Sequence, residues 1–151
     1  MADDDKTISG NESYDAEVAT EPAAPATGAA RATIYVCITC RGPSGVAADP
    51  PPGALVAAAT VAAASGTAIT VRPVKCLANC SRGPSAAMRA AASWTYLFGG
   101  LDPGAAPALV TGARMLAAAP DGILPWRGRP DVLKRGLIAR IPPLGFREET
   151  E

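Results

Sequence analysis

Four cysteines, arranged as two close pairs, are the residues of this chain best suited to chemistry. The first pair is spaced C-x-x-C, at Cys37 and Cys40, and the second is spaced C-x-x-x-C, at Cys76 and Cys80. The 151 residues include no histidine, which excludes histidine-based acid–base catalysis, Ser–His–Asp and Cys–His catalytic groups, and zinc fingers that use histidine. The chain shows no phosphate-binding glycine loop and no paired carboxylates near the cysteines, so we expect it not to be an enzyme. Its chemistry should therefore depend on thiols, which are metal ligands and redox groups.

The two pairs are predicted to meet because each follows a β-strand. Residues 32–37 (ATIYVC) and 67–74 (TAITVRPV) are rich in β-branched side chains and predict two strands. Residues 54–65 predict an alanine-rich helix between them, and Pro51 and Pro52 suit its start. A strand–helix–strand unit pairs its strands in parallel, so both carboxyl ends lie at one edge of the sheet. We therefore expect all four thiols at this edge.

The rest of the chain predicts a hairpin and two further helices. Residues 86–91 and 94–98 predict two strands joined by a short turn, and the alternating aromatic residues of 94–98 are expected to pack in the core. Residues 102–119 predict a helix, and residues 130–141 predict a last short helix. The order of these elements predicts an α/β fold, a thioredoxin-like small sandwich made of a βαβ unit, a β-hairpin and a C-terminal helix.

Charge divides the chain into two parts. Residues 1–31 hold seven acidic and two basic residues without apolar periodicity, so we expect a disordered acidic tail. Residues 32–147 hold twelve basic and four acidic residues and are expected to form one domain. The overall charge of zero gives no reason to expect nucleic acid or a membrane as a partner. The acidic start is unlike a signal peptide, and the longest apolar run is too short to span a bilayer, which favours a cytoplasmic protein.

Four thiols at one edge are compatible with four kinds of site. A [2Fe–2S] cluster needs four thiolates and is favoured by two cysteine-bearing loops at a sheet edge. Structural zinc also accepts four cysteines, but neither pair has the C-P-x-C-G form of zinc knuckles. A redox dithiol at Cys37 and Cys40 would need a helix to begin at the first cysteine, whereas residues 41–53 intervene. Disulfides or unconnected buried cysteines are the remaining possibility, which a cytoplasmic location disfavours.

The sequence around the second pair resembles that of the thioredoxin-like [2Fe–2S] ferredoxins. The resemblance rests on a C-x-x-x-C motif with Leu77 after its first cysteine, separated from the earlier pair by 35 residues. Residues 74–85, 94–103 and 120–144 are similar, more narrowly, to a bacterial family of small predicted metal-binding proteins of unassigned function, often encoded near cobalamin-synthesis genes.

The resemblance implies a one-electron carrier, a ferredoxin, that binds one [2Fe–2S] cluster through all four cysteines. Its partners would be redox proteins, a reductase and an electron acceptor, and the ferredoxins also imply a homodimer. The alternatives are a zinc- or metal-handling protein with the same four ligands and, less favoured, a thiol–disulfide oxidoreductase.

This chain departs from the resembling proteins at two positions. Ala78 stands where glycine is common, which is tolerable if its backbone angle is ordinary. No further cysteine occurs near residues 84–85, where the narrower family often has one, so four cysteines must suffice. Basic residues at Arg41, Lys75 and Arg82 flank the cysteines and would stabilise a reduced cluster and attract an acidic partner, or else are ordinary loop surface.

Overall fold

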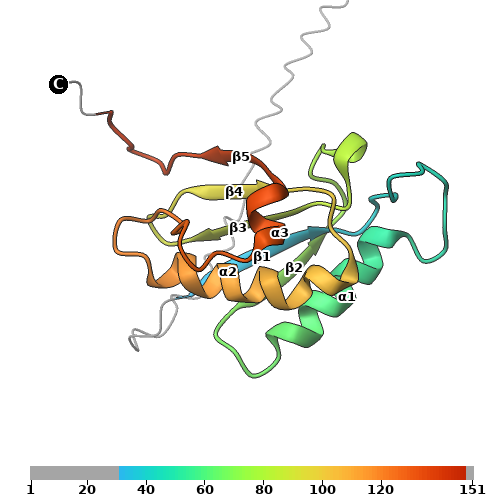
Figure 1. Ribbon diagram of the computed structural model, residues 1–151, viewed down its shortest axis with the longest axis horizontal. Coiled ribbons are helices and arrows are strands. Elements are labelled where there is room, and N and C mark those ends of the chain that lie inside the picture. Colours follow the sequence, from blue (N-terminus) through green and yellow to red (C-terminus); the bar gives the residue numbers. More distant parts are fainter. Residues whose placement is uncertain (1–30, 149–151) are drawn as a thin grey trace, which may run out of the picture.

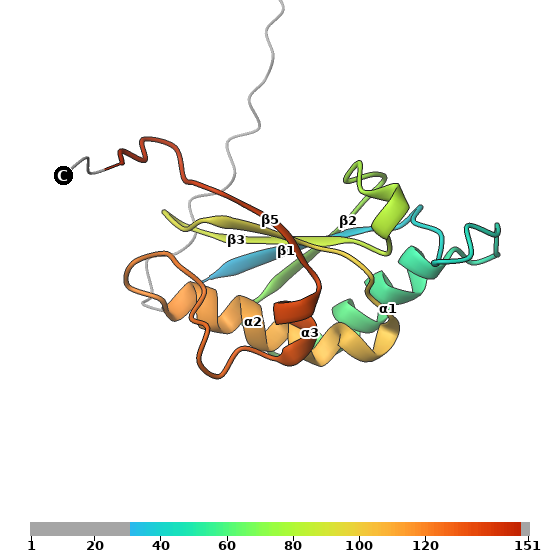
Figure 2. The ribbon, with the colours of Figure 1, turned by 45° about the horizontal axis from the view of Figure 1, so that its top comes forward.

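The protein is a five-stranded sheet with its helices packed on one face, as Figures 1 and 2 show from two directions. This computed structural model describes residues 31–148. The expected acidic tail, residues 1–31, lies outside the described residues except for Arg31. Among the described residues, no helix is long and apolar enough to cross a membrane.

The sheet combines one parallel pair of strands with three antiparallel pairs. Its order is β2-β1-β3-β4-β5. The strands are β1 (Ala32–Cys37), β2 (Thr70–Val74), β3 (Ala86–Ala90), β4 (Thr95–Phe98) and β5 (Leu137–Ile141). β1 and β2 pair in parallel, and the other neighbours are antiparallel. The predicted βαβ unit and the predicted hairpin of β3 and β4 are therefore confirmed.

Two helices of similar length cover the sheet. Helix α1 (Pro52–Ala64) connects β1 to β2, and α2 (Ala106–Ala118) follows β4 after a short 3-10 turn at Pro103–Ala105. Pro52 opens α1 as predicted, because its fixed φ suits a first turn in which its missing N–H is not needed. The two helices contact each other and β1. Their alanine-rich sequences allow this close approach.

The strand before the second cysteine pair begins later than the sequence predicts. Thr67 lies in a turn instead, where its hydroxyl donates to the carbonyl oxygen of Ala64 at 2.6 Å and accepts from the N–H of Ile69 at 3.2 Å. This local hydrogen bonding competes with strand pairing, which is typical of threonine next to a helix end. The carboxyl end of the strand, which positions the cysteines, lies at Val74 as predicted.

The core lies between the sheet and the helices. Its large, fully buried side chains include Ile34 and Val36 from β1, Met88 from β3, Tyr96 and Phe98 from β4, and Leu109 and Leu116 from α2. The rings of Tyr96 and Phe98 are stacked with centroids 6.3 Å apart, and Trp94 is half-buried against the same core. The prediction that the alternating aromatic residues pack in the core is confirmed.

The prediction of a last helix over residues 130–141 is wrong for most of these residues. Only α3 (Asp131–Arg135) is helical, and β5 follows it. Gly136 separates the two at a crowded point, since an added Cβ would lie 2.9 Å from the carbonyl oxygen of Gly99. The apolar spacing that predicts a helix here competes with β-branched Ile138 and Ile141 and with the backbone groups that β4 offers at its edge. Pairing with β4 provides hydrogen-bond partners for those backbone groups. This gain outweighs the tendency of the apolar spacing to form a helix.

Candidate metal centre

The two cysteine pairs lie at the same edge of the sheet, beyond the carboxyl ends of β1 and β2. Cys37 is the last residue of β1 and stands opposite Val74, the last residue of β2. The loop after β1 bends over the neighbouring strand, because the N–H of Ile38 donates to Val74 O at 2.9 Å and Cys37 Sγ lies 3.4 Å from Lys75 O. Cys76 follows directly on that strand's end. The parallel pairing thus brings together the two loops that carry the cysteines.

At this edge the cysteines form two contacting pairs. The thiols of Cys37 and Cys40 lie close enough to shift each other's pKa, and Cys76 lies close enough to raise the pKa of Cys80. Cys37 and Cys80 belong to different pairs, yet they are close enough to interact electrostatically. Within residues 31–148, no three Cys, Asp or Glu side chains gather closely enough to hold one metal ion. The arrangement is therefore two neighbouring thiol pairs.

The two thiol pairs differ in burial. Cys37 and Cys40 are 1% and 3% exposed, whereas Cys76 and Cys80 lie at the surface. Burial, with the hydrogen bond to Cys37, raises the pKa of Cys40 to about 11. Burial also opposes ionisation of Cys37, but hydrogen bonds from Cys40 and Thr39 outweigh it and lower the pKa of Cys37. Contact with Cys76 raises the pKa of Cys80. Cys37 is therefore the more acidic thiol of the inner pair.

The difference in burial predicts the order in which the thiols react. In metal-free protein kept reduced, we expect iodoacetamide to modify Cys76 and Cys80 first, because Cys37 and Cys40 become accessible only when the loops open. Mass spectrometry after timed exposure measures the order. Modification of the inner pair at the same rate as the outer pair would contradict the burial described here.

Backbone groups lie near the sulfur atoms of both pairs. The N–H of Ala78 donates to Cys76 Sγ at 3.2 Å. The backbone groups of Thr39 and Leu77 help to lower the pKa of Cys37. Hydrogen bonds of this kind stabilise negative charge on sulfur, whether in a thiolate or in a metal–thiolate bond.

Ala78 adopts the left-handed backbone conformation, with φ at +57°. Alanine is expected to be tolerable here only if the backbone angle is ordinary. The structure shows that the angle is not ordinary. The position is one that glycine takes without strain and that costs an alanine roughly 1 kcal/mol. The same conformation directs the Ala78 N–H at Cys76 Sγ, so the strain accompanies a contact to the candidate site.

A substitution that relieves this strain at residue 78 is expected to stabilise the protein. Ala78→Gly should raise the free energy of unfolding by up to about 1 kcal/mol, because the strain relieved exceeds the entropy that glycine adds to the unfolded chain. The control is Ala58→Gly on the exposed side of α1, which should instead destabilise by about 1 kcal/mol. Urea unfolding measures both, and a less stable Ala78→Gly protein would contradict the expectation.

Ser85 and Asn79 join the two cysteine loops. Ser85 is fully buried, and its carbonyl oxygen accepts the N–H of Cys37 at 3.0 Å. Its hydroxyl accepts from Asn79 Nδ2 at 2.8 Å, and Asn79 lies inside the second cysteine motif. Ser85 also partly offsets the rise in the pKa of Cys40. A serine therefore contacts both loops near the position where the resembling family often has a further cysteine.

Two glycines allow close packing around the inner pair. An added Cβ at Gly83 would lie 2.8 Å from Cys40 Sγ, and one at Gly53 would lie 2.1 Å from Cys37 O. Gly53 belongs to the first turn of α1, and its N–H donates to Cys40 O at 2.9 Å. Helix α1 does not begin at the cysteines in sequence, but folding brings its first turn against their loop. Sequence patterns do not reveal this contact, since it joins separate segments.

Comparisons with known proteins give a family and a fold. The family described as "Protein of unknown function (DUF1636)" matches residues 34–143. No curated protein matches the sequence. A solved structure of a thioredoxin-like [2Fe–2S] ferredoxin from Aquifex aeolicus is similar, at 16% identity and a TM-score of 0.50, over 77% of this chain and 97% of that chain. The wild-type form of such a ferredoxin from Aquifex aeolicus, solved at 1.5 Å, is also similar, at 16% identity and a TM-score of 0.49, over 72% of this chain and 96% of that one. The predicted thioredoxin-like fold is confirmed.

Proposed function

We propose that this chain, which belongs to the family described as "Protein of unknown function (DUF1636)", is a one-electron carrier that binds one [2Fe–2S] cluster through Cys37, Cys40, Cys76 and Cys80. The observation that carries the proposal is that the two cysteine loops lie at one edge of the sheet, where Cys40 of one pair and Cys80 of the other line the same hollow. A [2Fe–2S] cluster takes four thiolates. The similar fold of a protein described as a [2Fe–2S] ferredoxin supports the same assignment.

The donor set fits such a cluster, and a hollow lies where the two pairs adjoin. A hollow of about 430 Å³ is lined by Cys40 from the inner pair and Cys80 from the outer pair. Its other lining side chains include Thr39 and Ser81, and none of its lining residues is acidic. Thiolates are thus the strongest ligands that this chain offers there, which suits iron and sulfide.

The residues of this chain would set the properties of the bound group. When bound, a [2Fe–2S] cluster supplies a one-electron couple between diferric and mixed-valence iron. The N–H of Ala78 and the hydrogen bonds from Ser85 would stabilise added negative charge on the sulfur ligands. Exposed Cys76 and Cys80 would keep one side of the site at the surface, where a protein partner can approach.

The proposed partners are a reductase that supplies the electron and a protein that accepts it. A homodimer is a further prediction, which sedimentation analysis of the purified protein would test. No catalytic residue is proposed, because the role assigned to this chain is electron transfer alone.

Visible and electron paramagnetic resonance spectra of anaerobically purified protein test the proposal. The oxidised protein should be reddish-brown, and reduction by dithionite should bleach it and produce the signal of one unpaired electron. A zinc-handling protein would be colourless and give no signal in either state. A thiol–disulfide oxidoreductase would be colourless too, but would reduce the disulfides of insulin.

A further inference from the structure

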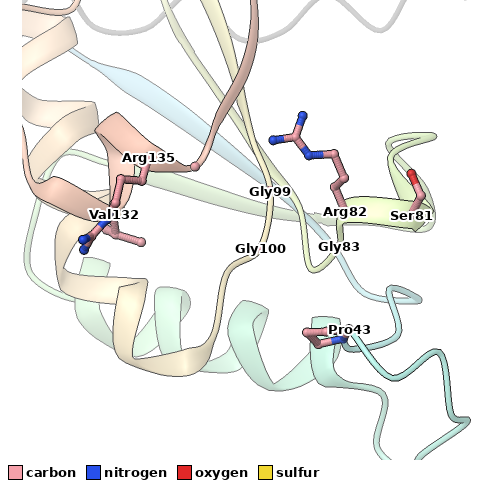
Figure 3. A pocket seen from close by; sticks show the side chains of 9 residues that line it. Pro43, Ser81, Arg82, Gly83, Gly99, Gly100, Val132 and Arg135 are labelled. Atoms are coloured by element: carbon pink, nitrogen blue, oxygen red, sulfur yellow. The ribbon is translucent and has the colours of Figure 1, made fainter.

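A concave surface surrounds Pro43, next to the two cysteine loops. Three hollows share this residue: the one that contains Cys40 and Cys80, a second of about 490 Å³ and a third of about 200 Å³. Figure 3 shows the second hollow, between the loop of Ser81 and Arg82 on one side and α3 on the other. We call the lining of the three hollows the Pro43 surface.

The third hollow is apolar. It is lined mainly by prolines and leucines, among them Pro43, Pro52, Pro84, Leu55 and Leu101. Leu55 lies on the first half of α1 and is 46% exposed, so its side chain is accessible to another molecule. The only charged lining residue is Asp102. This hollow has room for one apolar side chain from another molecule.

The second hollow is basic. Arg82 and Arg135 line it and no acidic residue does. Neither guanidinium has a hydrogen-bond or ion-pair partner within residues 31–148. In Figure 3 the two guanidinium groups lie well apart, that of Arg82 above the cysteine loop and that of Arg135 on the other side of α3. They are therefore placed to meet separate acidic groups on a large partner, and not to clamp one small anion.

We propose that the Pro43 surface is the docking site of an acidic electron-transfer protein, which inserts an apolar side chain beside Leu55 and sets carboxylates against Arg82 and Arg135. This inference rests on the proposed function. An apolar centre with charges at its rim is typical of protein interfaces, and charge complementarity mainly speeds encounter. Residues 32–147 carry twelve basic and four acidic side chains, so an acidic protein is the complementary partner.

Docking here would also place the partner over the candidate metal centre. The hollow that contains Cys40 and Cys80 adjoins the other two at Pro43. One electron would pass from the reduced cluster to the partner's oxidised group, with no bond made or broken and no proton moved. An electron would travel a shorter distance from the cysteines through the Pro43 surface than through the far face of α1 and α2. The Pro43 surface is therefore the better docking site.

Two haem proteins of opposite charge serve as probes: cytochrome b5, which is acidic, and cytochrome c, which is basic. Each ferric haem takes one electron from the reduced full-length protein and becomes ferrous, and stopped-flow absorbance gives the rate. Arg82→Glu should slow the reaction with cytochrome b5 about tenfold more than Arg114→Glu, an equal charge change on an exposed part of α2. With cytochrome c, Arg82→Glu should be faster than the Arg114→Glu control.

A matched pair of variants on α1 tests the apolar hollow. Leu55→Ser should slow the reaction with cytochrome b5 severalfold, whereas Val61→Ser should leave it nearly unchanged. Val61 is 49% exposed on the same helix but does not line the hollow. In the unaltered protein, the rate with cytochrome b5 should fall steeply as salt is added.

Iron and sulfide content is measured first in every variant, which separates the two proposals. If the unaltered protein contains no iron and sulfide, the proposed function is contradicted. A loaded protein in which Arg82→Glu and Arg114→Glu have equal effects would overturn the docking site, and so would equal rates for Leu55→Ser and Val61→Ser. A rate with cytochrome b5 that is flat or rises with salt would overturn it as well.

Discussion

Replacing any one of the four cysteines by serine is expected to remove most of the bound iron and sulfide. A serine hydroxyl is a much weaker ligand for iron than a thiolate, and the chain has no histidine and no fifth cysteine to take its place. Cys80→Ser is the most informative variant, because Cys80 is exposed and its replacement leaves the core unchanged. Iron, sulfide and visible absorbance of the purified variant measure the loss. The matched control is Ser81→Ala, next to it in the same loop, which should retain the full cluster.

The pattern across the four variants separates the proposals. A Cys76→Ser or Cys80→Ser protein with an unchanged spectrum and full iron content would remove that residue from the site. Sensitivity confined to Cys37 and Cys40 would favour a dithiol at the inner pair. Equal loss at all four positions is the expected result, because each pair would supply two of the four ligands.

Gly53→Ala is expected to have the second-largest effect, although residue 53 carries no ligand. Its Cβ would lie 2.1 Å from Cys37 O and 3.0 Å from Cys40 N, so the helix or the cysteine loop must move. Overpacking of this kind costs about 1–3 kcal/mol. Because the displaced loop carries the inner thiol pair, iron content should fall together with stability.

Gly42→Ala is the control for this substitution. The loop after Cys40 also contains Gly42, but its Cβ would meet only Pro52 Cγ, at an ordinary 3.6 Å. Urea unfolding and iron analysis should therefore show Gly42→Ala close to the unaltered protein and Gly53→Ala well below it. Equal stability and iron content in the two variants would show that α1 does not pack against the inner pair as described.

Much of the fold could be predicted because local sequence and tertiary structure agree. Strand β1 coincides with its β-branched run, and Pro52 marks the start of α1. The C-terminal segment shows the opposite case. Its apolar spacing predicts one helix, but Gly136 ends α3 and β5 pairs with β4, a result that depends on an edge formed by distant residues. Sequence spacing carries no information about that edge.

The candidate site could be predicted in part for the same reason. Residue type and spacing identify the four cysteines, and the parallel βαβ unit places their loops at one edge. The left-handed angle of Ala78, the burial of Cys37 and Cys40, and the close approach of Gly53 depend on the folded chain. Ser85 is similar, since only the structure shows that its backbone and hydroxyl contact both loops.

The most direct test of the central claim is the iron, acid-labile sulfide and zinc content of the full-length protein purified without oxygen. A [2Fe–2S] cluster predicts about two irons and two sulfides per chain and little zinc. One tightly bound zinc per chain without sulfide, in protein that iron and sulfide cannot convert to a coloured form, would contradict it.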